Sequence, residues 1–146
     1  MTEAADGLGL AGYYDYYDNP VKIMPTADGG LTAWRLDHRT GGWQAADDVV
    51  DEIVFAMGGD IFVRSADRFV QRVEEERGRY LKGDGPVFAL YETVRAIDEQ
   101  ATAERRAYTP EEAALVAGIR RRTFVMFEEQ LQRAGDPGAD PTIAAS

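Results

Sequence analysis

The chain has 146 residues, 45% of them hydrophobic and 29% charged, a composition typical of one globular domain and not of a disordered chain. It has no cysteine, which excludes disulfide scaffolds, thiolate nucleophiles and cysteine-based zinc sites. Its formal net charge of -10 opposes binding to nucleic acids and anionic membranes and favours a basic protein partner.

The N-terminal stretch MTEAADGLGLAG carries two acidic residues and no basic one, which is unlike a secretory signal peptide. No apolar run approaches the roughly 20 residues that a membrane-spanning helix requires. We therefore expect a cytoplasmic protein without a membrane-bound form.

The stretch GYYDYYDNP, residues 12–20, contains four tyrosines and two aspartates. In a strand, alternation would place Tyr13 and Tyr17 on one face and Tyr14 and Tyr16 on the other. In a helical turn, at about 100° per residue, the four rings would fall within an arc of roughly 160°. The pattern therefore predicts a short amphipathic helical turn at this position.

The next segment, from Val21 to about Trp43, predicts β-structure. The runs VKIMPT and LTAWRLD are separated by the turn ADGG and followed by the turn HRTGG. Asp-Gly and Gly-Gly between such runs are strong hairpin signals. The run DIFVR, residues 60–64, predicts one more strand.

Four helices are predicted after Trp43. Residues 47–59 carry apolar side chains at helical spacing and offer Gly58 as a C-cap, and a second helix begins after Ser65 and ends at Gly83. A third begins at Pro86 and buries a face that includes Tyr91.

The last predicted helix has the clearest start, because Thr109 and Glu112 form a capping box around Pro110. Gly135 and Pro137 end it, and the small, polar residues 136–146 predict a flexible tail. The order of elements favours a single α+β domain over residues 1–135. We expect a small antiparallel sheet of two to four strands near the N-terminus, packed against about four C-terminal helices.

No catalytic, metal or cofactor motif accompanies these elements. His38 is the one histidine, and we interpret it as a solvated turn residue, since a general base also needs an orienting group and a nucleophile. The carboxylates of residues 47–52 are the one metal candidate, but they lack a calcium-loop pattern and suit a helix N-terminus. The glycine-rich spots lack phosphate-binding spacing. We expect no cofactor and no metal, and the sequence leans against an enzyme.

The arginine triplet at residues 120–122 is the main basic concentration. Consecutive helical residues fan apart by about 100°, so the triplet cannot form one phosphate-reading row. Together with the net charge of -10, this argues against nucleic-acid binding.

The first functional hypothesis is a non-enzymatic acidic interaction module, either an immunity or antitoxin-like protein or an adaptor, that binds a basic protein. Tyrosine mixed with aspartate is typical of a recognition surface. The predicted partner-binding residues are Tyr13, Tyr14, Asp15, Tyr16, Tyr17 and Asp18.

The alternative is a small-ligand-binding or enzymatic domain with a pocket between the sheet and the helices. Its predicted lining is Trp34, Arg35, His38 and Tyr91. Assembly into a homo-oligomer is a third hypothesis, which would also use the tyrosine face.

Overall fold

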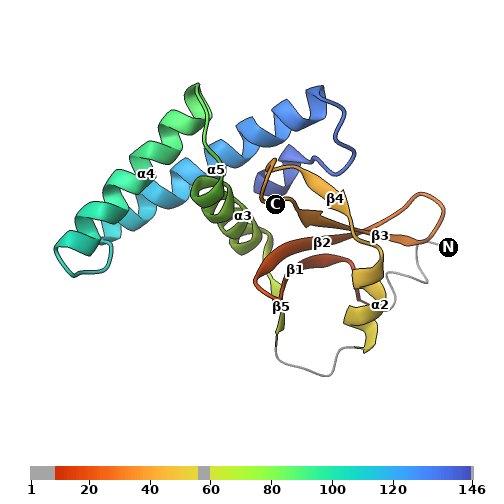
Figure 1. Cartoon of the computed structure of the whole chain (residues 1–146). Coiled ribbons are helices and arrows are strands. Elements are labelled where there is room, and N and C mark those ends of the chain that lie inside the picture. The colour runs from red at the N-terminus through yellow and green to blue at the C-terminus, as the bar shows by residue number, and fades with distance from the viewer. Residues whose placement is uncertain (1–8, 56–59, 146) are drawn as a thin grey trace.

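The computed structural model describes residues 9–55 and 60–145 and shows an α+β fold, as predicted (Figure 1). Its antiparallel sheet has five strands in the order β4-β3-β2-β1-β5, and not two to four. Their bounds are β1 Gly12–Tyr16, β2 Asn19–Pro25, β3 Leu31–Leu36, β4 Trp43–Ala45 and β5 Ile61–Arg64. The prediction of a strand at residues 60–64 is confirmed by β5.

Three long helices follow the sheet, where about four C-terminal helices were expected. They are α3 (Ala66–Tyr80), α4 (Pro86–Ala103) and α5 (Pro110–Arg133), and the short helix α2 (Asp48–Phe55) lies between β4 and β5. The predicted C-cap of that first helix, Gly58, lies outside the described residues. None of the helices in the described ranges is both long and apolar enough to span a membrane.

Both faces of the sheet are covered. On one face, α3, α5 and the 3-10 helix η1 (Pro141–Ala145) pack over Leu36 and Trp43. On the other face, α2 packs over β2 and β3 through Val49. The tip of the α4–α5 hairpin, where α4 ends and α5 begins, projects away from the sheet beyond α3 (Figure 1). The sheet is therefore the middle layer, and the hairpin is the most remote part of the molecule.

The prediction of a helical turn at the tyrosine-rich stretch is wrong, because Gly12–Tyr16 form β1. Tyr17 and Asp18 have φ values of 49° and 63°, the left-handed conformation of a two-residue hairpin turn, and they join β1 to β2. Side chains of β1 alternate between the two faces of the sheet. Tyr13 packs against Phe69 of α3, with ring centroids 4.8 Å apart, and Tyr14 lies in the core beneath α2. Tyrosines can occupy both faces because both faces are buried.

The predicted helix starts are confirmed. The Ser65 hydroxyl accepts a hydrogen bond from Arg68 N, and Thr109 and Glu112 form the reciprocal capping box that begins α5. Helix α3 ends at Tyr80, before the predicted Gly83, because Leu81 adopts an extended conformation.

The flexible tail predicted for residues 136–146 is largely replaced by ordered structure. The backbone N–H of Trp43 donates to Asp136 Oδ2 at 3.0 Å, and Ile143 is only 2% exposed. Gly138 lies so close to Trp43 that a β-carbon added there would be 2.5 Å from the tryptophan Cβ. The small residues of this C-terminal segment therefore allow its backbone to lie close to the core.

Replacement of Ile143 by alanine tests the contribution of this segment. The side chain packs with Phe69, Val70 and Phe124, so we expect the free energy of unfolding to fall by about 2–4 kcal/mol. Urea denaturation measures the loss, and exposed Ala145 changed to serine serves as the control, with an effect below about 0.5 kcal/mol. A loss equal to that of the control would show that the segment is detached in solution.

Candidate functional site

The six predicted partner-binding residues do not form one surface. Tyr14 and Asp15 are buried, and Tyr13 and Tyr16 are half-buried. Tyr17 is 60% exposed, and Asp18, its neighbour in the turn, is exposed too. The part of the stretch that faces solvent is therefore the β1–β2 turn.

Asp15 is held by two arginines. Its carboxylate lies 2.7 Å from Arg64 Nε on β5 and 3.5 Å from Arg72 Nε on α3. The aspartate thus ties the central part of β1 to the neighbouring strand and to the covering helix. We assign it a structural role.

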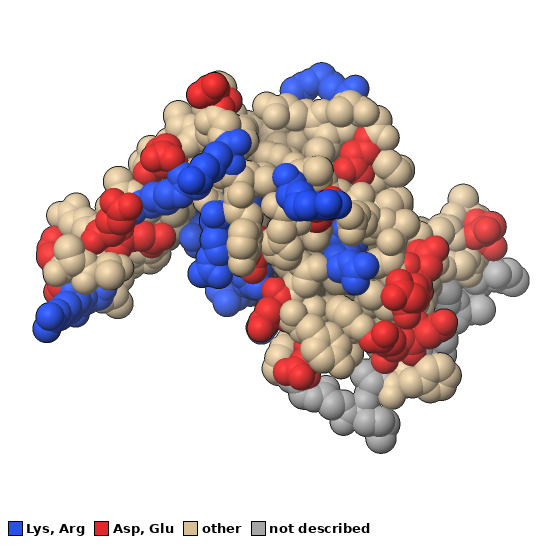
Figure 2. Space-filling view, viewed as in Figure 1, with Lys and Arg blue, Asp and Glu red and all other residues tan. Residues whose placement is uncertain are grey.

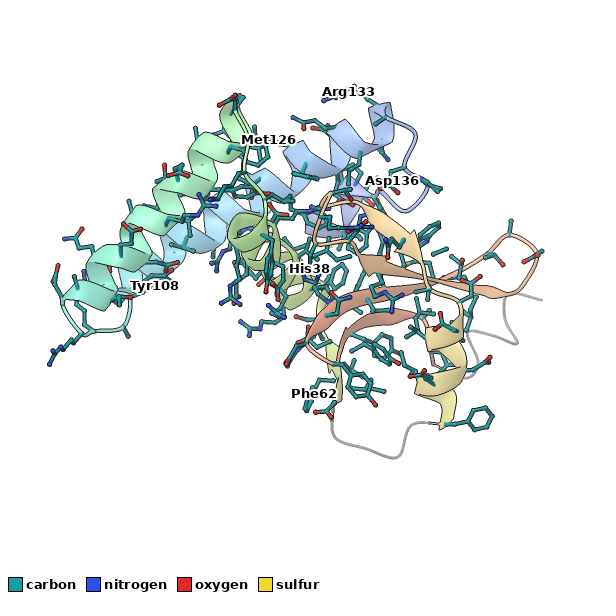
Figure 3. All side chains as sticks on the ribbon, viewed as in Figure 1. His38, Phe62, Tyr108, Met126, Arg133 and Asp136 are labelled. Atoms are coloured by element: carbon teal, nitrogen blue, oxygen red, sulfur yellow. The ribbon has the colours of Figure 1, made fainter. Side chains whose placement is uncertain are left out.

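Strand β5 carries exposed apolar side chains at the end of the sheet. Phe62 is 49% exposed and Val63 is 75% exposed, and Tyr17 adjoins them because its backbone N–H donates to Asp60 O at 2.8 Å. Figure 3 shows Phe62 at the sheet edge, remote from the α4–α5 hairpin. We call Tyr17, Phe62 and Val63 the β5 edge surface. Sequence reasoning missed Phe62 and Val63, although their apolar run in a predicted strand was a usable signal.

The backbone of β5 has a free side. In an antiparallel ladder, hydrogen-bonded and non-hydrogen-bonded pairs alternate. Tyr17 and Asp60 are a hydrogen-bonded pair, so the pairs Tyr16–Ile61 and Tyr14–Val63 are not. The N–H and C=O groups of Ile61 and Val63 therefore point away from β1. Within the described residues no strand lies on that side.

An acidic segment flanks this edge. Residues 40–63 contain five acidic residues and no Lys, Arg or His. Ile53 of α2 and Ile61 of β5 pack against the same core cluster, which places α2 next to the edge. Figure 2 shows the acidic side chains gathered over α2. All five are exposed, and none forms an ion pair with another described residue: Asp47, Asp48, Asp51, Glu52 and Asp60.

The acidic segment shows no metal centre among the described residues. No group of three His, Asp or Glu side chains in residues 9–55 and 60–145 is arranged to hold an ion. Asp47 instead accepts hydrogen bonds from Thr32 Oγ1 and Ala33 N, each at 3.1 Å. This carboxylate fastens the start of α2 to β3.

A buried ionic cluster lies between the sheet and α5. The guanidinium of Arg77 donates to Glu74 at 2.9 Å, to Glu128, and to Gly41 O at 2.8 and 3.0 Å, and all three charged side chains are 0% exposed. Trp43 Nε1 donates to both Glu128 oxygens at 3.1 Å. Sequence reasoning missed this cluster, because charged residues are rarely buried and Glu128 lies 51 positions from Arg77 in the chain.

Two more polar side chains complete the cluster. The Lys22 ammonium donates to Gly138 O and lies 4.4 Å from the centre of the Trp43 ring. Burial lowers its pKa, and the Glu128 carboxylate opposes that shift. The Tyr91 hydroxyl donates to Glu74 at 2.8 Å, and burial followed by the Glu74 charge raises its pKa.

The cluster suits a structural role better than a catalytic one. Burial raises the pKa of the Glu74 carboxyl, while Arg77 opposes that shift. Each carboxylate is already engaged by donors of the chain itself, and neither reaches solvent. A general acid or base needs access to its substrate, which these groups lack.

A pocket of about 630 Å³ opens between α3, α4 and α5, and we call it the three-helix pocket. Tyr91, Val94 and Thr123 form its buried floor. Arg79 and Arg120 stand on its walls. This pocket lies among helices, whereas the sequence predicted one between the sheet and the helices.

The four residues predicted for that ligand site do not converge. Trp34 packs against the core cluster beneath α3, and Tyr91 borders the three-helix pocket. Arg35 and His38 border a shallow depression at the β3–β4 turn. His38 lies 3.8 Å from Glu76 and contacts the edge of Tyr80, so it faces α3.

No family model, curated protein or solved structure matches this chain. No residue role is therefore transferred from a relative. The features that bear on function are the β5 edge surface with its acidic flank, and the three-helix pocket.

Replacement of Arg77 by methionine tests the ionic cluster. It leaves two buried carboxylates without their cation, so we expect a loss of about 3–5 kcal/mol in the free energy of unfolding at neutral pH. A raised pKa in the folded state means that protonation stabilises the fold, so the loss should shrink as the pH falls toward the ordinary value of 4.5.

Urea denaturation at several pH values measures both effects. Adding Glu74→Gln and Glu128→Gln to the Arg77→Met variant removes the unpaired charges and should recover part of the stability. A loss below about 1 kcal/mol for Arg77→Met alone would contradict the assigned role.

Proposed function

We propose that this chain is a non-enzymatic interaction module that binds a basic segment of a partner protein along β5. Immunity or antitoxin-like proteins and adaptors are the kinds of protein that work in this way. The observation that carries the proposal is an open sheet edge with exposed Phe62 and Val63 beside an acidic segment that contains no basic residue.

The edge is suited to the addition of a strand, because β5 offers both backbone hydrogen-bonding groups and exposed apolar side chains to a partner. The N–H and C=O groups of Ile61 and Val63, which no strand of the described residues pairs with, would supply main-chain hydrogen bonds to an added strand. Phe62 and Val63 lie on opposite faces of the sheet, so a bound strand would contact one on each side. An exposed apolar edge without lysine or proline also lacks the usual protection against pairing.

Charge selects the partner. The five acidic residues of segment 40–63 supply half of the formal net charge of -10. Such a field raises the rate at which a basic segment meets the edge, and it repels acidic competitors. The expected partner segment is extended, carries lysine or arginine, and has apolar residues that reach Phe62 and Val63.

Replacement of Val63 by proline tests strand addition. Its N–H faces away from β1, so proline should preserve the sheet while blocking an added strand. Val63→Thr keeps the N–H and serves as the matched control. A basic protein captured at low salt by the wild type should bind the proline variant at least about tenfold more weakly, as measured by biolayer interferometry.

Circular dichroism and hydrogen exchange accompany this comparison. Circular dichroism verifies the fold of each variant, and the amides of Ile61 and Val63 in the wild type should gain protection when the partner binds. Equal affinity of a folded Val63→Pro variant, with no new protection, would refute strand addition.

Neutralising the acidic flank tests charge selection. The variant Asp48→Asn, Asp51→Asn, Glu52→Gln should lower the association rate constant about tenfold at low ionic strength, with a smaller effect at high salt. Glu99→Gln, Glu111→Gln, Glu129→Gln removes the same charge from exposed positions on α4 and α5 and serves as the control. Equal association rates for the two variants would contradict selection by the acidic segment.

A further inference from the structure

The three-helix pocket has the size of a small-molecule site. Its volume of about 630 Å³ lies within the range of about 300–1,000 Å³ that is usual for ligand pockets. It opens between α3 and the projecting α4–α5 hairpin. Figure 2 shows basic side chains gathered in the angle between this hairpin and the body of the molecule. Basic side chains are thus concentrated near this pocket, although the protein as a whole is acidic.

The acidic residues of the pocket already have partners. Glu74 is paired with Arg77 and accepts the Tyr91 hydroxyl, and Glu75 lies 3.8 Å from Arg72. The third carboxylate of the pocket, Asp98, accepts a hydrogen bond from the Tyr108 hydroxyl. Arginines therefore offset the charges of Glu74 and Glu75, whereas Asp98 receives only a hydrogen bond from a neutral hydroxyl.

The basic residues of the pocket are less completely paired. Arg95 is engaged by Glu92 and by the carbonyl oxygens of Gly78 and Leu81. In the part of the chain that the structure describes, no hydrogen bond or ion pair engages the guanidinium of Arg79 or Arg120. Two cations without partners on the walls of one pocket favour an anionic ligand.

Gly78 is a second sign that this space is kept open. It lies inside α3, where glycine costs about 1 kcal/mol of helix stability relative to alanine. Neither backbone conformation nor crowding requires glycine, because an added β-carbon would approach Tyr91 at an ordinary 3.7 Å. The glycine lines the pocket, so the missing side chain enlarges it.

The remaining walls are apolar or aromatic. Tyr108 and Ile119 are half-buried and border the pocket above its floor of Tyr91 and Val94. Figure 3 shows Tyr108 at the far end of the α4–α5 hairpin. A flat apolar body fits such walls, while its acidic group reaches the arginines.

We propose that the three-helix pocket binds a small organic anion, in which a planar apolar body lies against Tyr108 and Ile119 and a carboxylate, sulfonate or phosphate group pairs with Arg79 and Arg120. This site lies on helices remote from β5 and does not rest on the proposed function. Binding of the anion and binding of a basic partner are separate properties.

The probe for this site is 8-anilinonaphthalene-1-sulfonate, in which a planar naphthalene ring carries one sulfonate and one anilino group. Isothermal titration calorimetry should give one site on the wild type, and amide shifts in ¹H–¹⁵N spectra should concentrate on residues of the pocket. Arg79→Gln, Arg120→Gln should weaken binding at least about tenfold. Arg122→Gln, Arg133→Gln changes the net charge equally at exposed positions outside the pocket and should leave affinity within about twofold.

Two further measurements distinguish the contribution of the pocket's shape to ligand binding from that of its arginine charges. N-phenyl-1-naphthylamine has a similar body without the sulfonate, so its affinity should be unaffected by the loss of Arg79 and Arg120. Gly78→Leu fills the pocket and should abolish binding of both probes, while Gly78→Ala verifies that the helix accepts a side chain.

Several results would overturn the proposal. They are no binding of the sulfonate at 1 mM, amide shifts centred outside the pocket, equal losses in the two arginine variants, or unchanged affinity in a folded Gly78→Leu variant.

Discussion

The fold depends on the guanidinium of Arg77, which sits where three parts of the chain meet. It binds Glu74 on its own helix, Glu128 on α5 and the carbonyl oxygen of Gly41 in the β3–β4 turn. These partners are buried, so the loss of the guanidinium would leave two carboxylates without their cation in a region of low dielectric. Apolar contacts between the sheet and the helices have little directional preference. The hydrogen bonds around Arg77, by contrast, require a specific orientation of the guanidinium and its acceptors. Glycine is required at position 41 by the same closeness, since a β-carbon there would lie 2.6 Å from Leu81 and Phe127 atoms.

Charge is divided between the two ends of the molecule. The sheet end carries the acidic segment and the β5 edge surface. At the helical end, Arg79 and Arg120, which form no ion pair with a described residue, border the three-helix pocket. The net charge of -10 does not reveal this division, because it is a total for the whole chain and contains no information on the positions of the charges. The proposed basic partner and the proposed organic anion would therefore approach opposite ends. The ionic cluster lies between them and contributes Glu74 and Tyr91 to the floor of the pocket.

Local signals in the sequence predicted local structure. The capping box at Thr109, the Ser65 cap and the strand at residues 60–64 each depend on a few neighbouring residues, and each is confirmed. The tyrosine-rich stretch was assigned wrongly because alternation indicates a strand only when one face is wet, and here both faces are covered. The C-terminal segment was assigned wrongly because the Asp136 carboxylate, the Gly138 carbonyl and Ile143 contact residues that are distant in the chain, and no local pattern reports such contacts. The edge position of β5 and the pairing of Arg77 with Glu128 arise from contacts between distant residues, which periodicity does not reveal.

The hydrogen bond from Lys22 to the carbonyl oxygen of Gly138 joins residues 116 positions apart. At the usual pace of about 5–20 residues per second, a ribosome needs about 6–23 s to add the residues that separate them. During that interval the nascent β1–β2–β3 meander has a lysine on the face that will become the core, without the carbonyl that receives it. The hydrated ammonium opposes early burial of this face, and the final packing of the sheet includes the C-terminal segment. Completion of the core therefore waits for the residues around Gly138, even though the strands are synthesised first.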